Sequence, residues 1–277
     1  MLKRFAVYSG VAMLALASGA AHAADLDQVI YAPEVPMTKP VEVGSGWYLR
    51  GDLGYSLSTK GAATSYSSYT NVPAPAYFNT LYGSSSLEGD WSGSLGAGYS
   101  FTDYLRADAT LDFTEADFAA STAFAIPCFG SPVGTTCRGD DAQSVTTYGF
   151  MANVYADLGT LAGFTPYLGG GAGFSKVSWD DLSTTATCLG VGCGAPVTSV
   201  NPGLESWRFT YALMAGLSYD VSQNVKIDLG YRYQNIADGE MYGYDAASVA
   251  AGAAGVRAHD NGFEKHEVRA GLRYALW

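Results

Sequence analysis

The sequence has no long apolar run after its first residues, no excess of basic side chains and only 3 histidines. Beyond residue 23 it has no stretch of about 20 apolar residues, so no membrane-spanning α-helix is expected. Its 26 acidic residues outnumber its 15 lysines and arginines. Such a chain repels phosphate groups, which argues against nucleic-acid partners. What is abundant is Gly (34) and Tyr (20), a composition that favours strands over helices.

The first 23 residues predict a secretory signal peptide. Lys3 and Arg4 precede the apolar stretch FAVYSGVAMLALASGA, and Ala21-His22-Ala23 places small residues before a cleavage site at Ala24. A transmembrane anchor is the alternative, but the stretch is short and wrongly flanked for one. Residues 24–45 are proline-rich and aperiodic. We expect them to form an irregular tail that precedes a single domain over residues 46–277.

Eight later segments alternate apolar and polar residues with a period of two, as β-strands do. They are 46–57, 90–101, 104–113, 146–158, 165–175, 207–220, 225–234 and 266–277. Each is about as long as a tilted strand that crosses a bilayer. Short turns alternate along the chain with long connections rich in Ser, Thr, Gly, Ala and Pro. This pattern predicts an all-β fold: an eight-stranded antiparallel up-and-down transmembrane β-barrel, with four long extracellular loops and short periplasmic turns.

Alternation alone does not decide which face points inward, because a soluble lipocalin-like barrel has similar strands. Aromatic residues near both ends of the apolar face, such as Trp91 and Tyr99, favour lipid outside. The polar face carries equal numbers of basic and acidic residues, which can neutralise one another in a narrow lumen. This predicted interior charge network comprises Arg50, Asp52, Asp90, Arg106, Asp108, Asp112, Lys226, Asp228, Arg232, Glu267, Arg269 and Arg273.

The segments GWYLRGDLGYS, TPYLGGGAGFS, MAGLSYDVSQNVKIDLGYRYQNI and HEVRAGLRY resemble the small outer-membrane β-barrel proteins of alphaproteobacteria. These porin-family proteins include the Brucella and Rhizobium surface antigens and are related to opacity proteins and to the OmpA transmembrane domain. The resemblance covers the signal and all eight strands, but not the loops. It implies a location in the cell outer membrane of a Gram-negative bacterium. The implied partners are membrane lipid, lipopolysaccharide, the barrel assembly machinery and periplasmic chaperones.

The last strand departs from the pattern of that family, which usually ends in Tyr, any residue and Phe. Here Tyr274 is followed by Leu276, and Trp277 stands one place out of phase. The resemblance implies that Tyr274, Leu276 and Trp277 form the assembly signal, with Trp277 as the candidate for the usual Phe.

The four cysteines are disulfide candidates: Cys128 and Cys137 in the second long loop, Cys188 and Cys193 in the third. Three pairings are possible, of which the two local bonds close short loops and need no contact between loops. A zinc site is the alternative, but no histidine is near either pair. We expect no metal and no cofactor. We expect the acidic pairs Asp140-Asp141 and Asp180-Asp181 to be solvated side chains rather than a calcium site.

Function follows less directly from the sequence than fold. We expect a non-enzymatic, structural surface protein that supports envelope integrity and surface interactions, through a loop ligand that the sequence does not identify. A narrow porin-like channel is the first alternative, although the balanced interior charges favour a packed plug. A lipid A-modifying enzyme is the second. It would need a histidine–serine pair, and neither His259 nor His266 has a serine within two residues.

Overall fold

The computed structural model describes residues 46–276, apart from 61–62, 72, 90 and 254–256. The predicted signal peptide, the predicted tail and Trp277 therefore lie outside the described residues. Within the described part of the chain, no helix is long and apolar enough to cross a membrane.

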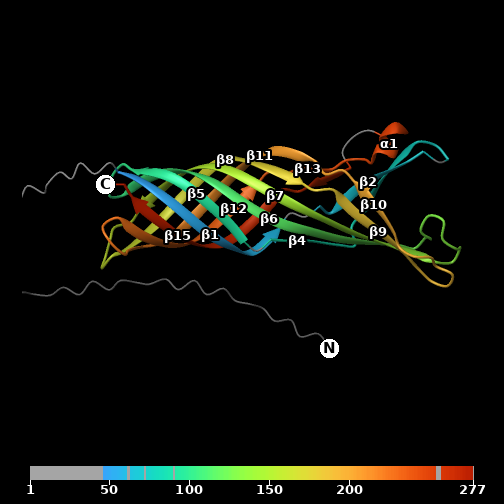
Figure 1. The fold of residues 1–277 in the computed structure, drawn as a ribbon, viewed down its shortest axis with the longest axis horizontal. Helices are drawn as coiled ribbons and strands as arrows, with labels where there is room; N and C mark the ends of the chain where they lie inside the picture. The colour runs from blue at the N-terminus through green and yellow to red at the C-terminus, as the bar shows by residue number, and fades with distance from the viewer. Residues whose placement is uncertain (1–45, 61–62, 72, 90, 254–256, 277) are drawn as a thin grey trace, which may run out of the picture. The chain divides into compact units, whose positions relative to one another are not determined.

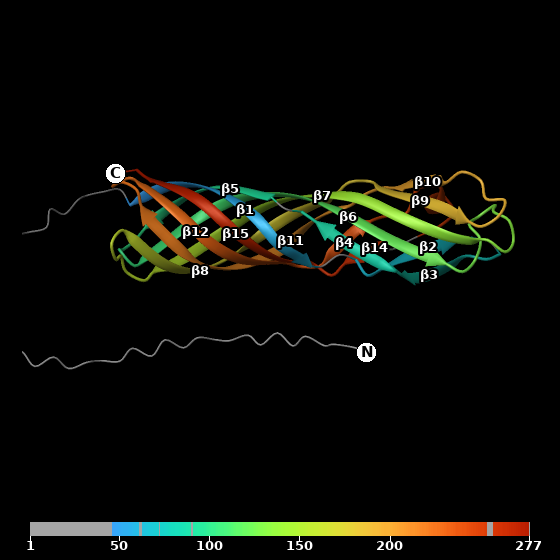
Figure 2. The ribbon, with the colours of Figure 1, turned by 90° about the horizontal axis from the view of Figure 1, so that it is seen from below.

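Eight antiparallel strands close into a barrel, which confirms the predicted fold class (Figures 1 and 2). They are β1 (Trp47–Lys60), β5 (Trp91–Ser100), β6 (Leu105–Phe124), β7 (Thr136–Asp157), β8 (Phe164–Trp179), β11 (Glu205–Asp220), β12 (Val225–Ile236) and β15 (Phe263–Ala275). Each strand pairs with the next in this order, and β15 returns to β1. Closure leaves no free edge within the barrel wall, as a bilayer requires.

Strands β6 and β7, with 20 and 22 residues, are much longer than the sequence pattern indicated. Their ladder continues past the predicted ends, Phe113 and Thr146, as far as the pair Phe124 and Cys137. The predicted boundaries were wrong because the outward side chains stop being apolar there, although the alternation and the hydrogen bonding continue.

The long connections carry further secondary structure beyond the barrel (Figure 2). The added elements are β2 (Ser65–Thr70), β3 (Ala76–Leu81), β4 (Ser84–Glu88), β9 (Leu182–Leu189), β10 (Val197–Asn201), β13 (Gly239–Tyr242), α1 (Ala246–Ala250) and β14 (Ala258–Asp260). Strands β4 and β9 pair with the extensions of β6 and β7, and β10 pairs with β9. A second sheet has the order β13-β14-β2-β3. We call these elements, with the extensions of β6 and β7, the extracellular sheet region.

The opposite end of the barrel carries the three short turns predicted from the sequence, at 101–104, 158–163 and 221–224. The turn between β7 and β8 places Gly159 and Gly163 at positive φ, which glycine adopts without a steric penalty. The last described residue, Leu276, donates its backbone N–H to the carbonyl of Trp47 at 2.8 Å. The barrel therefore starts and ends at the turn side.

Candidate functional site

The outer wall of the barrel is a band of exposed apolar side chains with aromatic rings at both rims. At the loop-side rim Tyr55 packs edge-on against Trp91, with ring centroids 5.2 Å apart. At the turn-side rim Trp47 packs against Tyr99, at 5.3 Å. Leu95, between the rims, has 71% of its surface exposed. An apolar band between two aromatic girdles is the outer surface of a transmembrane barrel.

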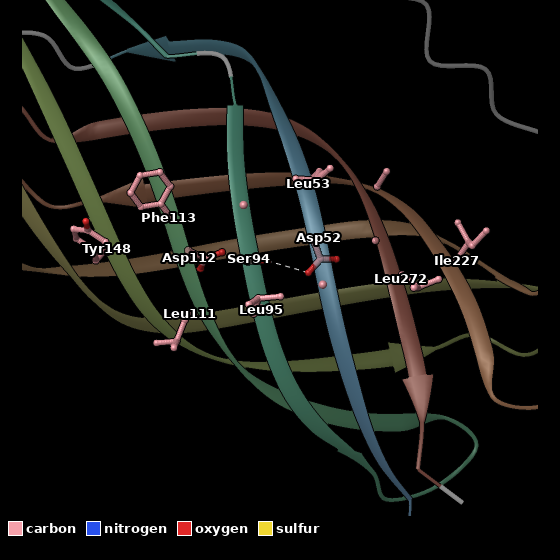
Figure 3. A pocket seen from close by; sticks show the side chains of 14 residues that line it. Asp52, Leu53, Ser94, Leu95, Leu111, Asp112, Phe113, Tyr148, Ile227 and Leu272 are labelled. Atoms are coloured by element: carbon pink, nitrogen blue, oxygen red, sulfur yellow. Dashed lines mark hydrogen bonds between the residues drawn. The ribbon is translucent and has the colours of Figure 1, made fainter.

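A shallow hollow of about 810 Å³ lies on this lipid-facing wall (Figure 3). Outward-facing Gly51 and Gly93 leave it open, and leucines border it. On the inner side of the same wall, Ser94 donates a hydrogen bond to Asp52 at 3.0 Å. A single layer of backbone thus separates lipid-facing from ion-paired side chains.

Inside the barrel, one set of ion pairs is centred on Arg50. Its guanidinium binds Asp52 and Asp108, each at 2.7 Å, and donates to the Tyr155 hydroxyl at 2.7 Å. Arg106 pairs with Asp157 at 3.1 Å, and its guanidinium carbon lies 4.0 Å from the centroid of the Tyr155 ring. Buried charges persist when they are paired and hydrogen-bonded.

A second set is centred on Arg232, which binds Asp112 at 2.9 Å and Glu267 at 2.7 Å. Arg269 lies 3.5 Å from Asp112 and 3.8 Å from Asp52, so it links the two sets. The network therefore joins residues from strands on opposite sides of the lumen.

The remaining residues of the predicted network lie as follows. Arg273 is buried and pairs with Asp228 at 2.9 Å. Lys226 is only half-buried and pairs with Asp220 at 2.6 Å, near a turn. Asp90 lies outside the described residues.

Two buried cations were not among the interior residues predicted from the sequence. Arg208 binds Asp260 at 2.7 Å, above the network. It occupies the polar phase of segment 207–220, which could have revealed it. Lys265 is also buried, but it lies one residue before the predicted start of the last strand, so no pattern included it.

Charged and aromatic side chains occupy the middle of the lumen. One space among them, bordered by Arg50, Tyr155, Tyr167, Met214 and Arg232, measures about 10 Å³, which is room for a single water molecule at most.

In the extracellular sheet region the interior is mainly apolar, apart from the Arg208–Asp260 pair. Phe118 packs against Trp179, and Trp179 against Phe263, with centroids 6.1 and 6.0 Å apart. The cluster also contains Ala63, Leu87, Ala116, Ala120, Val145, Val177, Leu182, Ile236, Met241, Tyr242 and Ala258. Outward side chains on the extensions of β6 and β7 are mostly polar; for example, Ser144 donates to Asp117 at 2.7 Å. This region is therefore packed as a water-soluble protein.

A cavity of about 290 Å³ lies between β2, β6, β7, β9, β10 and β13. Tyr66, Tyr242, Asp141 and Arg257 are among its lining residues. Burial raises the pKa of Asp141 above its usual range. Its neighbour Asp140 faces outward and pairs with Arg138 at 2.8 Å.

The cysteines form the two local disulfides, Cys128–Cys137 and Cys188–Cys193. Cys137 and Cys188 are also register partners in the β7–β9 ladder. Both bonds therefore lie side by side at the distal end of the extracellular sheet region.

The two histidines have tyrosine and aspartate partners. His266 shares a hydrogen bond with Tyr231, and His259 Nε2 lies 2.7 Å from Asp238. The Asp181 carboxylate accepts from the backbone N–H of Gly203. Among the described residues, no group of three or more His, Cys, Asp or Glu is placed to hold a metal ion.

Comparison with known proteins agrees with this architecture. The model of the outer membrane protein beta-barrel domain matches residues 10–275. An uncharacterized protein of Brucella suis is 39% identical over 270 residues and 92% of each chain. The outer membrane protein PagN of Salmonella typhimurium is 28% identical over 59% of this chain and 69% of its own. Neisserial surface protein A is a structural neighbour at a TM-score of 0.44 and 20% identity, covering 84% of this chain and 98% of its own.

The family match covers nearly the whole chain, and the apolar outer wall agrees with the location that the match indicates. The protein is a surface protein of the cell outer membrane. The chain belongs to the outer membrane protein beta-barrel domain family.

Proposed function

We propose that the protein is a non-enzymatic anchor that holds its extracellular sheet region at the bacterial surface, where it supports envelope integrity and surface contacts. The observation that carries the proposal is the network of paired charged side chains in the middle of the lumen, where the space beside Arg50 and Arg232 is about 10 Å³. The ion pair of Arg232 with Asp112 spans the lumen between opposite strands, which supports a barrel closed to solutes. The ordered part that reaches solvent is the extracellular sheet region.

The names of some relatives support a role in surface contact. A putative adhesin of Rickettsia bellii is 25% identical over 83% of this chain and 88% of its own. An adhesin needs an anchor in its own membrane and a shaped surface outside it. Both parts are present here.

Lipid and lipopolysaccharide surround the barrel wall, and just above the apolar band Lys176 pairs with Glu205 at 2.8 Å. Before insertion, periplasmic chaperones carry the chain to the barrel assembly machinery. That machinery reads a terminal signal that contains Tyr274, Leu276 and Trp277. Tyr274 lies on the exposed, lipid-facing side of β15, where an assembly factor can reach it.

Single-channel recording in planar bilayers tests the closed lumen. The wild-type protein is expected to give no conductance steps. The variant Arg50→Ala/Arg232→Ala, which removes the centres of both ion-pair sets, is expected to give small steps or to fail to fold. Regular ion-selective steps from the wild type would contradict the anchor role and support the alternative, a narrow pore.

Overexpression tests the absence of enzymatic activity. Lipid A from cells that overproduce the protein is expected to have an unchanged mass spectrum. A new lipid A species that disappears in a His266→Ala variant would show that the protein is an enzyme. Loss of the protein is expected to increase the sensitivity of the cells to detergent, and unchanged sensitivity would argue against a role in envelope integrity.

A further inference from the structure

The distal end of the extracellular sheet region is formed by residues 125–137 and 188–196, which are two loops with the strand residues up to Cys137 and from Cys188. We call this the tip. We propose that the tip inserts its apolar side chains into the surface of an apposing lipid bilayer. The proposal rests on the proposed function as a surface protein and names the partner of the tip.

The tip carries no charge, although the chain is rich in acidic residues. No Asp, Glu, Lys, Arg or His occurs between Asp117 and Arg138, or between Asp181 and Glu205. A charged side chain is costly to move into a bilayer. The tip avoids this cost on both of its loops.

The apolar side chains of the tip are almost completely exposed. Phe129, Val133 and Val191 have relative exposures of 108%, 99% and 95%. These values exceed that of Leu95, which faces the protein's own lipid. Because the two loops adjoin, these side chains give one end of the molecule an apolar surface, and a large exposed apolar surface marks an interaction site.

The protein's own membrane cannot cover the tip. The ladder of β6 and β7 continues from Phe113, at the rim of the band, to Phe124 at the base of the tip. At the rise of a β-strand this is a path of roughly 35–40 Å. The tip is therefore outside the bilayer that holds the barrel.

The two loops are held together before any partner binds. Each is closed by its own disulfide, and Cys137 and Cys188 are opposite one another in the β7–β9 ladder. Gly190 packs against Thr135 so closely that a Cβ there would lie 2.9 Å from the Thr135 side chain. A pre-ordered surface loses little conformational entropy on binding.

A lipid surface fits the tip better than a protein does. Protein interfaces are energetically dominated by Trp, Tyr and Arg, and the tip has none of these. Its apolar side chains are almost fully exposed. Protruding uncharged side chains enter the headgroup and acyl boundary of a bilayer without needing a complementary pocket.

Co-flotation tests the insertion. Full-length protein in lipid nanodiscs is mixed with vesicles of phosphatidylcholine, and the fraction that floats with the vesicles is measured. The wild type is expected to float. The variant Phe129→Ser/Val133→Ser/Val191→Ser is expected to bind about tenfold less or weaker still, because three apolar side chains no longer leave water.

A matched variant separates the tip from general stickiness. Phe78→Ser/Leu81→Ser/Val249→Ser removes the same number of exposed apolar side chains from β3 and α1, and its binding is expected to equal that of the wild type. Vesicles with phosphatidylglycerol are expected to bind no better than neutral ones, since the tip has no charge. Faster migration without boiling confirms that each variant contains a folded barrel.

The remaining outcomes overturn the proposal. Absence of wild-type flotation, or equal loss in both triple variants, excludes insertion by the tip. Self-association of nanodiscs without vesicle binding, abolished by the tip variant, would assign the tip to a second copy of the chain. A closed lumen without vesicle binding would leave the anchor function intact, whereas conductance by the wild type would overturn that function separately.

Discussion

Strands β6 and β7 run through two surroundings and change polarity between them. Up to Phe113 and Tyr148 their outward side chains are apolar, while inward positions include Arg106, Asp108 and Asp112. Beyond that level, outward Glu115 and other polar residues replace the apolar band, and the interior becomes apolar.

The change occurs at one level on both faces. Inward-facing Thr114, Thr147 and Lys265 separate the ion pairs below from the apolar cluster above. Where lipid surrounds the wall, apolar side chains are stable on the outside and paired polar groups fill the inside. Where water surrounds it, polar side chains face outward and apolar side chains are buried inside. The alternation keeps a period of two along both strands, and the surrounding medium decides which face carries the apolar side chains.

Loss of an interior charge is expected to have the largest effect on the membrane-embedded part. Asp112→Ala leaves Arg232 and Arg269 short of a buried partner, which is expected to lower the free energy of unfolding by about 3–5 kcal/mol. Urea unfolding in lipid vesicles measures this loss. Asp117→Ala, on the outer face of the same strand, is expected to change stability by less than about 0.5 kcal/mol; equal losses would contradict the account.

Loss of an interior apolar side chain is expected to be equally severe but confined to the extracellular sheet region. Phe118 is fully buried, so Phe118→Ala costs about 3–5 kcal/mol locally. Amide hydrogen exchange in β7 is expected to accelerate in residues 136–147, which belong to the extracellular sheet region. It is expected to remain slow in residues 149–157, which face the membrane. Uniform acceleration along the whole strand would show that the two regions unfold as one.

A charge added to the outside is expected to distinguish the two regions by position alone. Ala109 and Ala119 share the outward face of β6, on either side of the change. Ala109→Arg is expected to destabilise the barrel by about 2–4 kcal/mol, because the guanidinium faces lipid. Ala119→Arg faces water and is expected to be nearly neutral in the same urea titration. A similar cost at both positions would refute the boundary.

The smallest effect is expected at Asp141, inside the extracellular sheet region. Burial raises its pKa in the folded protein, so its contribution to stability is complete below the unfolded pKa and is lost as pH rises through the folded pKa. Asp141→Asn is therefore expected to stabilise this region at pH 7 and to have no effect below a pH of about 4. Hydrogen exchange of β7 at the two pH values checks this, and stabilisation that persists at low pH would argue against titration of Asp141.

The sequence predicted the eight strands because apolar phase and strand length both follow from crossing a bilayer. It did not predict the extensions of β6 and β7, since the apolar phase moves inward there while the alternation continues. A search for an inversion of phase at Glu115 and Ala116 would have found them. The strands of the long connections are short, and tertiary pairing, not periodicity, sets them.

The alternation along each strand predicted which charged side chains face the interior, but it did not predict which of them pair with one another. Arg269 approaches aspartates on two other strands, and such contacts depend on barrel register, which the sequence does not reveal. The same holds for Cys137 and Cys188, whose proximity comes from the pairing of β9 with β7. Pairing was therefore open among three arrangements until the fold was known.

Spin labels along the outward face of β6 test the change of surroundings most directly. Single cysteines at Ala109, Leu111, Glu115 and Ala119 are labelled in the folded protein in vesicles, and accessibility to oxygen and to a water-soluble nickel complex is compared. Oxygen is expected to dominate at Ala109 and Leu111, and nickel at Glu115 and Ala119. Continued oxygen dominance through Ala119, or nickel access at Ala109, would contradict the account.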